Sequence, residues 1–398
     1  MPGLPDFSQS WAATHPSPGA STAYEDGQGG PVQGRRECGT LYAIPCYASK
    51  NIIRRHDLKL NNNDKVEKLA VNIQQKLEGG PAILVGSGGS IPYGLPSMKD
   101  LALKIVDQLQ ETYRNEDDWK AFVAELESND NLESALEKIT LKEDIHNAII
   151  QTVWEFINKK DKDAFLEFIN KGNYPALTLI LRKFIQRAGS TNVITTNYDR
   201  LVEYSIDFAQ GKAETGFYGD YFKTFRTVNE GATKRTVNVF KVHGSVDWFR
   251  HNSNQNIMST SFLESGDLID TYIPLVVTPG NGKYKETHND PYRTVIAEAD
   301  KALRSSPSYL CLGYGFNDEH IQPIIIDENR NKNKPLVIVT KSITQKMEEL
   351  FIRNGNGNCL IISENGSSGT IVHYNKLETE LFDENYWEIE NFYKLWFE

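Results

Sequence analysis

Short runs of apolar and β-branched residues, several of them unbroken by any polar residue, recur along this chain. They are PAILVG at 81–86, NVITTN at 192–197, VNVFKVHG at 237–244, PLVVTP at 274–279, YLCLGYG at 309–315, PLVIVT at 335–340 and CLIIS at 359–363. Unbroken apolar strands are typical of a parallel sheet that is covered on both faces. Amphipathic helices are predicted between the later runs, at 295–305 and 342–354. The pattern therefore predicts an α/β fold with a Rossmann-like, doubly wound parallel sheet.

The first apolar run lies between two predicted helices. In the first helix the apolar residues fall on one face and Gly79-Gly80 ends it; these residues are Val66, Leu69, Ala70, Ile73 and Leu77. The second helix is predicted over 98–113, with Ser97 as its N-cap. Between them, GSGGS at 86–90 follows the strand directly. The order is strand, glycine-rich turn and helix.

Residues 114–190 have helical spacing with few β-rich runs, so we expect a helical insertion, either packed on the core or forming a small lobe. A chain of 398 residues is too long for one compact core, which agrees with this division. Residues 1–50 are rich in Pro, Gly, Ser and Ala and lack periodicity, which predicts a flexible tail. A packed or partner-binding arm is the alternative, because TLYAIPCYAS contains aromatic residues. Residues 51–398 form the predicted folded domain.

The bulk composition disfavours several classes of protein. A net charge of −10 argues against nucleic acid as the main ligand. Since the chain has neither a secretory signal nor an apolar run of about 18 residues, we expect a cytoplasmic protein that does not bind membranes. The cysteines Cys38, Cys46, Cys311 and Cys359 form no C-x-x-C pair, which suits a reducing compartment, and Cys311 is expected to be a small buried hydrophobe.

Four predicted strands end in polar or glycine-rich segments. These are GSGGS at 86–90, TTNYD at 195–199, HGS at 243–245 and GYGFND at 313–318. Each has a structural explanation of its own, because glycine permits a tight turn and Asn197 or Asp199 could cap a helix over 199–209. However, ligands of open α/β sheets bind beyond the carboxyl ends of the strands. Four such ends on one edge predict a ligand site there.

The glycine loop by itself identifies no ligand. It offers backbone N–H groups near a helix start, which suit a pyrophosphate, from Gly86, Ser87, Gly88, Gly89 and Ser90. Ile91 occupies the third glycine position of the G-x-G-x-x-G fingerprint, and the G-K-[ST] ending of a P-loop is missing.

The four segments together resemble a known family. GSGGSIPYGLPSM is similar to the sirtuin nucleotide loop, TTNYDRLVE to the T-x-N-x-D-x-L segment, KVHGS to the K-[LV]-H-G segment, and LGYGFNDEHI to the late strand and loop with ribose and adenine contacts. The motifs run in the family's order from Ala82 to Ile321. The chain most closely resembles the SIR2-like proteins of bacterial anti-phage defence, which implies an NAD-binding domain over 51–398.

One departure from the sirtuin pattern concerns zinc. Protein deacylase sirtuins carry a four-cysteine zinc module between the His-Gly strand and the late loop. Between His243 and Gly313 this chain has only Cys311, so we expect no zinc and no acyl-lysine groove built by that module. The activity that the resemblance then implies is hydrolysis of NAD⁺ to nicotinamide and ADP-ribose, with no cofactor beyond NAD⁺ as the substrate.

The resemblance also implies roles for particular residues. His243 would accept a proton, since imidazole titrates close to neutral pH, and Asn197 would hydrogen-bond a ribose hydroxyl and the water. Asp199 would orient a polar group or favour developing positive charge, with helix capping as an equal alternative. The expected NAD-binding residues are Gly86, Ser87, Gly88, Ser90, Pro96, Thr196, Gly244, Gly313, Tyr314 and Asp318. No other histidine forms a ligand cluster with His243, so no metal is expected there.

Two other functions remain open at this stage: a non-catalytic NAD or ADP-ribose sensor, and a zinc-free deacylase or ADP-ribosyltransferase. The pairing of Asn197 with His243 favours the hydrolase over the sensor, because binding alone needs no base. The missing cysteines favour it over the deacylase. The resemblance further implies an NAD-depleting effector restrained by homo-oligomerisation or by a partner, such as a HerA-type ATPase or an Argonaute.

Overall fold

The computed structural model describes residues 64–129, 132–186, 191–226, 235–264, 271–277, 288–318, 320–355, 357–366, 368–374 and 378–398. All of them lie within one unit, residues 55–398. The predicted tail at 1–50, with Cys38 and Cys46, lies outside the described residues.

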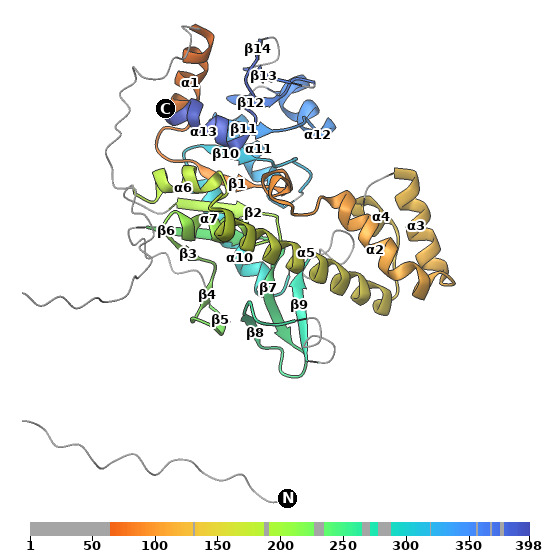
Figure 1. The fold of residues 1–398 in the computed structure, drawn as a ribbon. Helices are drawn as coiled ribbons and strands as arrows, with labels where there is room; N and C mark the ends of the chain where they lie inside the picture. Colours follow the sequence, from red (N-terminus) through yellow and green to blue (C-terminus); the bar gives the residue numbers. More distant parts are fainter. Residues whose placement is uncertain are drawn as a thin grey trace, which may run out of the picture. The chain divides into compact units, whose positions relative to one another are not determined.

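The central element is a sheet that holds nine strands in the described part of the chain (Figure 1). Its spatial order is β14 (Thr379–Phe382), β13 (Thr370–His373), β12 (Cys359–Glu364), β11 (Leu336–Thr340), β10 (Tyr309–Leu312), β1 (Ala82–Val85), β2 (Thr191–Thr195), β6 (Thr236–Lys241) and β3 (Lys212–Glu214). The strands from β12 to β3 are parallel, whereas β13 and β14 are antiparallel additions at one edge. Since β1 lies between β10 and β2, the strand order reverses at β1, where open α/β sheets bind their ligands.

Both faces of this sheet are covered by helices. Alternate residues such as Ile83 and Val85 face one cluster, and Ala82 and Leu84 face the other. The first cluster is covered by α1 (Asp64–Lys76), α6 (Leu177–Phe184), α7 (Leu201–Phe208) and α13 (Ile389–Phe397), and the second by α10 (Tyr292–Ser305), α11 (Gln322–Asn331) and α12 (Gln345–Met347). Because both faces are buried, the strands carry unbroken apolar runs. The predicted α/β fold with a doubly wound parallel sheet is confirmed.

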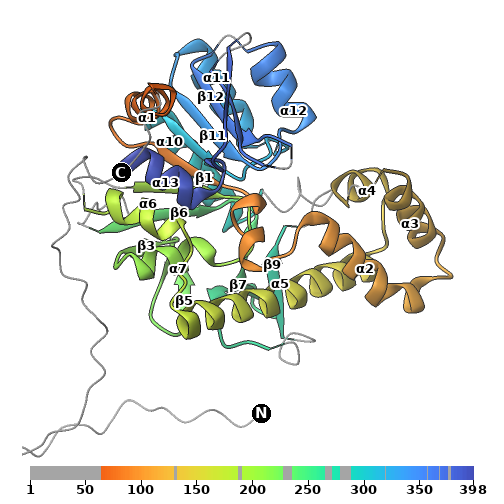
Figure 2. The ribbon, with the colours of Figure 1, turned by 45° about the horizontal axis from the view of Figure 1, so that its top comes forward.

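A helical lobe extends from the sheet (Figure 2). It comprises α2 (Met98–Tyr113), α3 (Asp117–Asn129), α4 (Leu132–Lys138) and the long α5 (Glu143–Lys171), whose apolar faces share one cluster. Ser97 caps α2 in a capping box with Asp100, as predicted. The lobe differs in extent from the predicted 114–190: α2 packs within it, whereas α6 packs on the sheet because Leu177, Ile180 and Leu181 join the sheet cluster.

A second, antiparallel sheet follows β6 along the chain. Its order is β4 (Phe217–Tyr218), β5 (Lys223–Phe225), β8 (Ile257–Ser259), β7 (Gly244–His251) and β9 (Tyr272–Val276). The prediction that the run at 274–279 is a strand of the parallel sheet is therefore wrong, since its described residues belong to β9, which pairs with β7. Leu275 and Val276 contact different apolar clusters. Burial on both sides thus gives an unbroken apolar run without a parallel sheet.

Candidate active site

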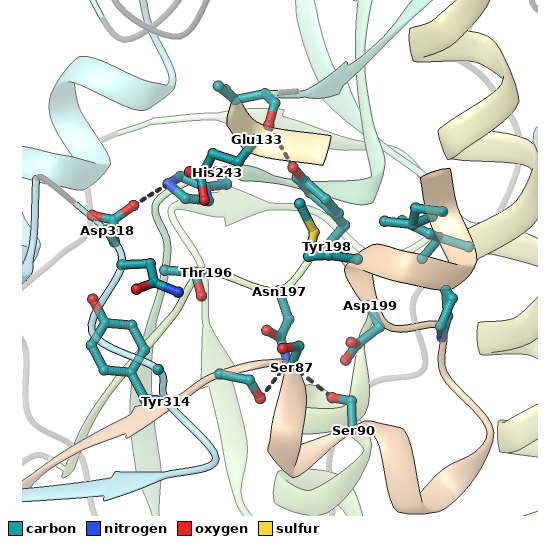
Figure 3. Close-up of a pocket in the computed structure, with 18 residues that line it drawn as sticks. Ser87, Ser90, Glu133, Thr196, Asn197, Tyr198, Asp199, His243, Tyr314 and Asp318 are labelled. Carbon is teal, nitrogen blue, oxygen red and sulfur yellow. Dashed lines mark hydrogen bonds and ion pairs between the residues drawn. The ribbon is translucent and has the colours of Figure 1, made fainter. Parts of the chain in front are cut away.

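The polar ends of four neighbouring strands meet at one pocket (Figure 3). Ser87 follows β1, Asn197 follows β2, His243 follows β6 and Asp318 follows β10. The pocket has a cavity volume of about 180 Å³ and opens to solvent.

Most of the residues predicted from sequence line this pocket. They are Gly86, Ser87, Ser90, Pro96, Thr196, Asn197, Asp199, His243, Tyr314 and Asp318. The other described lining residues were not predicted individually: Met98, Tyr198, Gly315 and Asn317 lie within the four motif segments, whereas Leu101, Glu133, Ile157 and Val277 lie outside them. Three predicted ligand-binding residues, Gly88, Gly244 and Gly313, are not among the described lining residues.

The reason is that these glycines allow close approach of backbone segments. A Cβ atom on Gly313, which has φ +58°, would lie 2.3 Å from the carbonyl carbon of Gly88. At Gly244, with φ +88°, it would lie 1.9 Å from the Leu275 carbonyl oxygen. L-residues rarely adopt this left-handed conformation. Gly244 therefore lets the chain turn from β6 into β7 directly after His243, which lies between the two strands instead of within one.

The glycine loop is less open than its sequence suggests. Gly86 N–H donates to the Leu312 carbonyl at 3.0 Å, and Gly88 N–H donates to the Gly313 carbonyl at 3.1 Å. The N–H groups of Gly89 and Ser90 close a short 3-10 turn by donating to carbonyls within the loop. The prediction that this loop presents unpaired N–H groups is wrong for these positions, because the loop packs against the segment after β10.

Asn197 is buried and connects its own strand end to the glycine loop. Its Nδ2 donates to the Gly86 carbonyl at 3.0 Å and to Ser90 Oγ at 2.9 Å (Figure 3). Its backbone N–H donates to Thr195 Oγ1 at 3.1 Å. With both side-chain N–H groups engaged, Asn197 has its Oδ1 left to accept a hydrogen bond from a ligand hydroxyl or a water.

Asp199 is buried beside the pocket and caps α7. Its Oδ1 accepts the Leu201 N–H at 3.0 Å, so the predicted contact with the helix start is present, although Arg200 holds the N-cap position itself. Burial raises the pKa of Asp199, although the nearby ammonium of Lys241 opposes that shift. Carboxyl groups whose pKa is perturbed by burial and by a charged neighbour are often found at functional sites.

His243 and Asp318 form a close pair across the pocket. The Nε2 atom of His243 lies 2.7 Å from Oδ2 of Asp318 (Figure 3). The other oxygen, Oδ1, accepts the backbone N–H groups of His320 and Ile321, both at 2.9 Å. These bonds fix the carboxylate at the beginning of α11, so that it faces the imidazole.

Two tyrosines complete this part of the pocket. Tyr198 donates its hydroxyl proton to the Val277 carbonyl at 2.6 Å, and burial raises its pKa strongly. Burial also raises the pKa of Tyr314, whose buried hydroxyl has no hydrogen-bond partner among the described residues. A buried hydroxyl without a partner costs about 1–3 kcal/mol unless a ligand or water satisfies it. Tyr314 therefore suits a polar ligand atom.

The helical lobe contributes one wall of the pocket. Met98 and Leu101 come from α2, Glu133 from α4 and Ile157 from α5. Met98 ends the first motif, whereas no sequence motif marks Leu101, Glu133 or Ile157, since their positions depend on how the lobe packs against the sheet.

In the ranges that the structure describes, no group of three or more His, Cys, Asp or Glu residues is arranged to hold a metal ion. Within the same ranges, no helix combines the length and apolar character needed to span a membrane.

Comparison with known proteins gives a family match over part of the chain. Residues 191–358 match the family model of the SIR2-like domain, which supports the SIR2-like fold expected from the motifs. No curated protein sequence matches the chain.

Among solved structures, one similar chain is a Sir2 enzyme with a deacetylated peptide and 3′-O-acetyl ADP-ribose, at 11% identity and a TM-score of 0.38, covering 83% of this chain and 96% of that chain. A Sir2 homologue in complex with ADP-ribose has 15% identity and a TM-score of 0.40, covering 71% and 87%. A Sir2 homologue in complex with NAD has 15% identity and a TM-score of 0.37, covering 71% and 84%.

Proposed function

We propose that this protein is an NAD⁺ glycohydrolase, which cleaves NAD⁺ and water to ADP-ribose, nicotinamide and a proton. The observation that carries the proposal is the meeting of Asn197, His243 and Asp318 with the glycine loop at the carboxyl edge of the sheet. The match of residues 191–358 to the SIR2-like domain supports the choice of NAD⁺ as the substrate.

In this reaction the bond between nicotinamide and the ribose anomeric carbon breaks, and its electron pair neutralises the pyridinium nitrogen. Positive charge develops on the ribose, and a water then forms the new bond to the anomeric carbon. The carboxylates of Asp199, Asp318 and Glu133 line the pocket, and negative charge close to the ribose would stabilise this transition state.

His243 is the proposed general base. It would accept the proton that the water loses, and the facing Asp318 carboxylate would stabilise the imidazolium that forms. Asn197 would orient the water or a ribose hydroxyl through Oδ1, because its Nδ2 protons are bound to the glycine loop. Tyr314 would donate to a polar atom of the dinucleotide.

We further propose that the enzyme is an NAD-depleting effector of anti-phage defence that acts in the cytoplasm. Unchecked loss of NAD⁺ would kill the host cell, so such an enzyme needs restraint. We expect this control to come from homo-oligomerisation or from a partner such as a HerA-type ATPase or an Argonaute. Neither zinc nor another cofactor enters the proposed reaction.

The test is NAD⁺ turnover by the purified protein, with nicotinamide and ADP-ribose followed by chromatography. His243→Ala and Asn197→Ala should each lower kcat by about 10²–10⁴-fold, the usual range for acid–base groups. Binding of ADP-ribose should change little in either variant. The matched controls are His251→Ala on β7 and Asn192→Ala on β2, since neither residue is among the described residues of the pocket.

The alternatives give different results in the same assay. Binding of ADP-ribose without turnover, also in the presence of candidate partners, would support a sensor and contradict the hydrolase. Release of nicotinamide only when an acylated peptide is present would support a deacylase. If neither NAD⁺ nor ADP-ribose binds, the nucleotide site itself is wrong.

A further inference from the structure

We propose that Asp161, on the lobe helix α5, is a positioning residue that holds the segment from Asn197 to Arg200 in its active conformation. This inference rests on the proposed function for its kinetic consequences, whereas its structural consequences are independent of it. Asp161 lies outside all four motifs, and its side chain is only 1% exposed.

A single carboxylate here accepts hydrogen bonds from four donors. Oδ1 of Asp161 accepts the backbone N–H of Arg200 at 2.6 Å. Its Oδ2 accepts hydrogen bonds from two guanidinium nitrogens of Arg200, Nε at 2.9 Å and Nη2 at 2.5 Å. The same oxygen accepts a hydrogen bond from the Tyr204 hydroxyl at 2.5 Å. Charge-assisted hydrogen bonds such as those from the guanidinium are roughly twice as strong as bonds between neutral groups. Asp161 thus holds both the backbone and the side chain of Arg200.

Arg200 directly follows the residues that line the pocket. Its backbone begins α7, and the preceding residue Asp199 caps that helix. Asn197 lies three positions earlier in the same turn. Any shift of the Arg200 backbone would therefore move the carboxylate of Asp199 and the amide of Asn197 relative to the glycine loop.

Two further buried contacts hold the same segment from other elements. Lys241, which is fully buried at the end of β6, donates from Nζ to the Asp199 carbonyl and pairs with Glu203 at 3.0 Å. Arg200 Nη1 donates to Ser261 Oγ at 2.5 Å in the segment after β8. The segment is thus anchored by the parallel sheet, the second sheet and the lobe, and Asp161 makes the contact from the lobe.

The charges explain why neither partner can be lost without consequence. Burial lowers the pKa of Arg200, but the Asp161 carboxylate more than offsets this, and the net pKa is raised. Removing one member of a buried pair leaves the other charge uncompensated, whereas replacing both by apolar residues is often neutral for stability. This difference allows a positioning role to be separated from a purely stabilising one.

The experiment uses the full-length chain and four variants. Asp161→Asn removes the charge but keeps the shape of the side chain. Tyr204→Phe removes one donor and leaves the ion pair intact. The double variant Asp161→Leu with Arg200→Met removes both charges together. Asp163→Asn is the matched control, because Asp163 is exposed on the same helix.

We expect Asp161→Asn to lower kcat by about 10–100-fold, since small misplacements of catalytic groups cost up to about this much. ADP-ribose affinity should change less than about threefold, because the glycine loop is held by β10 and not by Asp161. Tyr204→Phe should lower kcat about two- to fivefold. In the double variant the melting temperature should recover while kcat stays low. Asp163→Asn should match the wild type.

A readout without turnover separates this inference from the proposed function. Backbone amides at 197–201 should exchange hydrogen at least about tenfold faster in Asp161→Asn than in Asp163→Asn, with the amides of β11 unchanged. Wild-type turnover in Asp161→Asn, or recovery of kcat together with stability in the double variant, would overturn the positioning role. Absence of turnover in the wild type, also in the presence of candidate partners, would refute the proposed function alone, and the exchange data would still decide the role of Asp161.

Discussion

Replacing Asp199 by Asn separates the two roles open to this residue, helix capping and catalysis. Asn keeps an Oδ1 that can accept the Leu201 N–H, the capping bond that Asp199 makes at 3.0 Å. Asn and Asp are about equally good N-caps. Asp199→Asn therefore removes the charge and preserves the cap, whereas Asp199→Ala removes both and should cost about 1 kcal/mol of stability.

The direction in which the charge of Asp199 changes the stability of the fold follows from its pKa. Burial raises the pKa of Asp199 above its ordinary value of 3.8, so the folded protein binds this proton more tightly than the unfolded chain does. The stability from this group is complete below the ordinary carboxylate range and is lost as the pH rises through the raised pKa. Each unit of such a rise costs about 1.4 kcal/mol once the group is ionised. At neutral pH Asp199→Asn should therefore be at least as stable as the wild type, because the amide has no charge to desolvate.

The assay is urea unfolding of the wild type and both variants across the acid and neutral range, alongside NAD⁺ turnover. Any advantage of Asp199→Asn should shrink as the pH falls, because the raised pKa favours the neutral carboxyl group of Asp199 in the folded protein. Its kcat should fall by about 10²-fold, if the carboxylate stabilises charge in the transition state. Unchanged turnover in Asp199→Asn would leave Asp199 with a structural role only, and a lower stability of this variant at neutral pH would refute the sign of the charge effect.

Two further variants test the geometry of the site. Gly244→Ala should destabilise the protein by at least about 2 kcal/mol, because its Cβ would lie 1.9 Å from the Leu275 carbonyl oxygen at a left-handed backbone position; a wild-type melting temperature would contradict the close approach. Glu133→Gln should lower kcat about three- to tenfold and tighten ADP-ribose binding, because a carboxylate in the pocket favours the cationic transition state but repels the anionic product. Turnover gives kcat, and titration gives the ADP-ribose affinity. If kcat and this affinity fall by the same factor, Glu133 acts only by shaping the pocket.

The sheet was largely predictable because burial on both faces leaves a local trace. Residues 82–85 and 309–312 are apolar at every position, since alternate side chains enter different clusters. Ser97 with Asp100 likewise encodes a helix start within four residues. The same local pattern misled at Leu275 and Val276, which are buried on both sides in an antiparallel sheet.

The pocket was predictable for a topological reason. Carboxyl ends of parallel strands lie on one edge, so polar residues that follow such strands converge there. Asn197, His243 and Asp318 therefore come together although they are far apart in the chain. The hydrogen bonding of the glycine-loop backbone was not predictable. The N–H groups of Gly86 and Gly88 donate to carbonyls of a segment more than 200 residues later in the chain.

By itself, the sequence determined the central strands of the parallel sheet and the polar residues that follow them, since each depends on neighbours within a few positions. The tertiary structure alone decided what the helical lobe adds to the site. Glu133 enters the pocket and Asp161 binds Arg200 only because α4 and α5 pack beside the sheet edge. Such contacts join residues distant in the chain, and no local periodicity records the packing that brings them together.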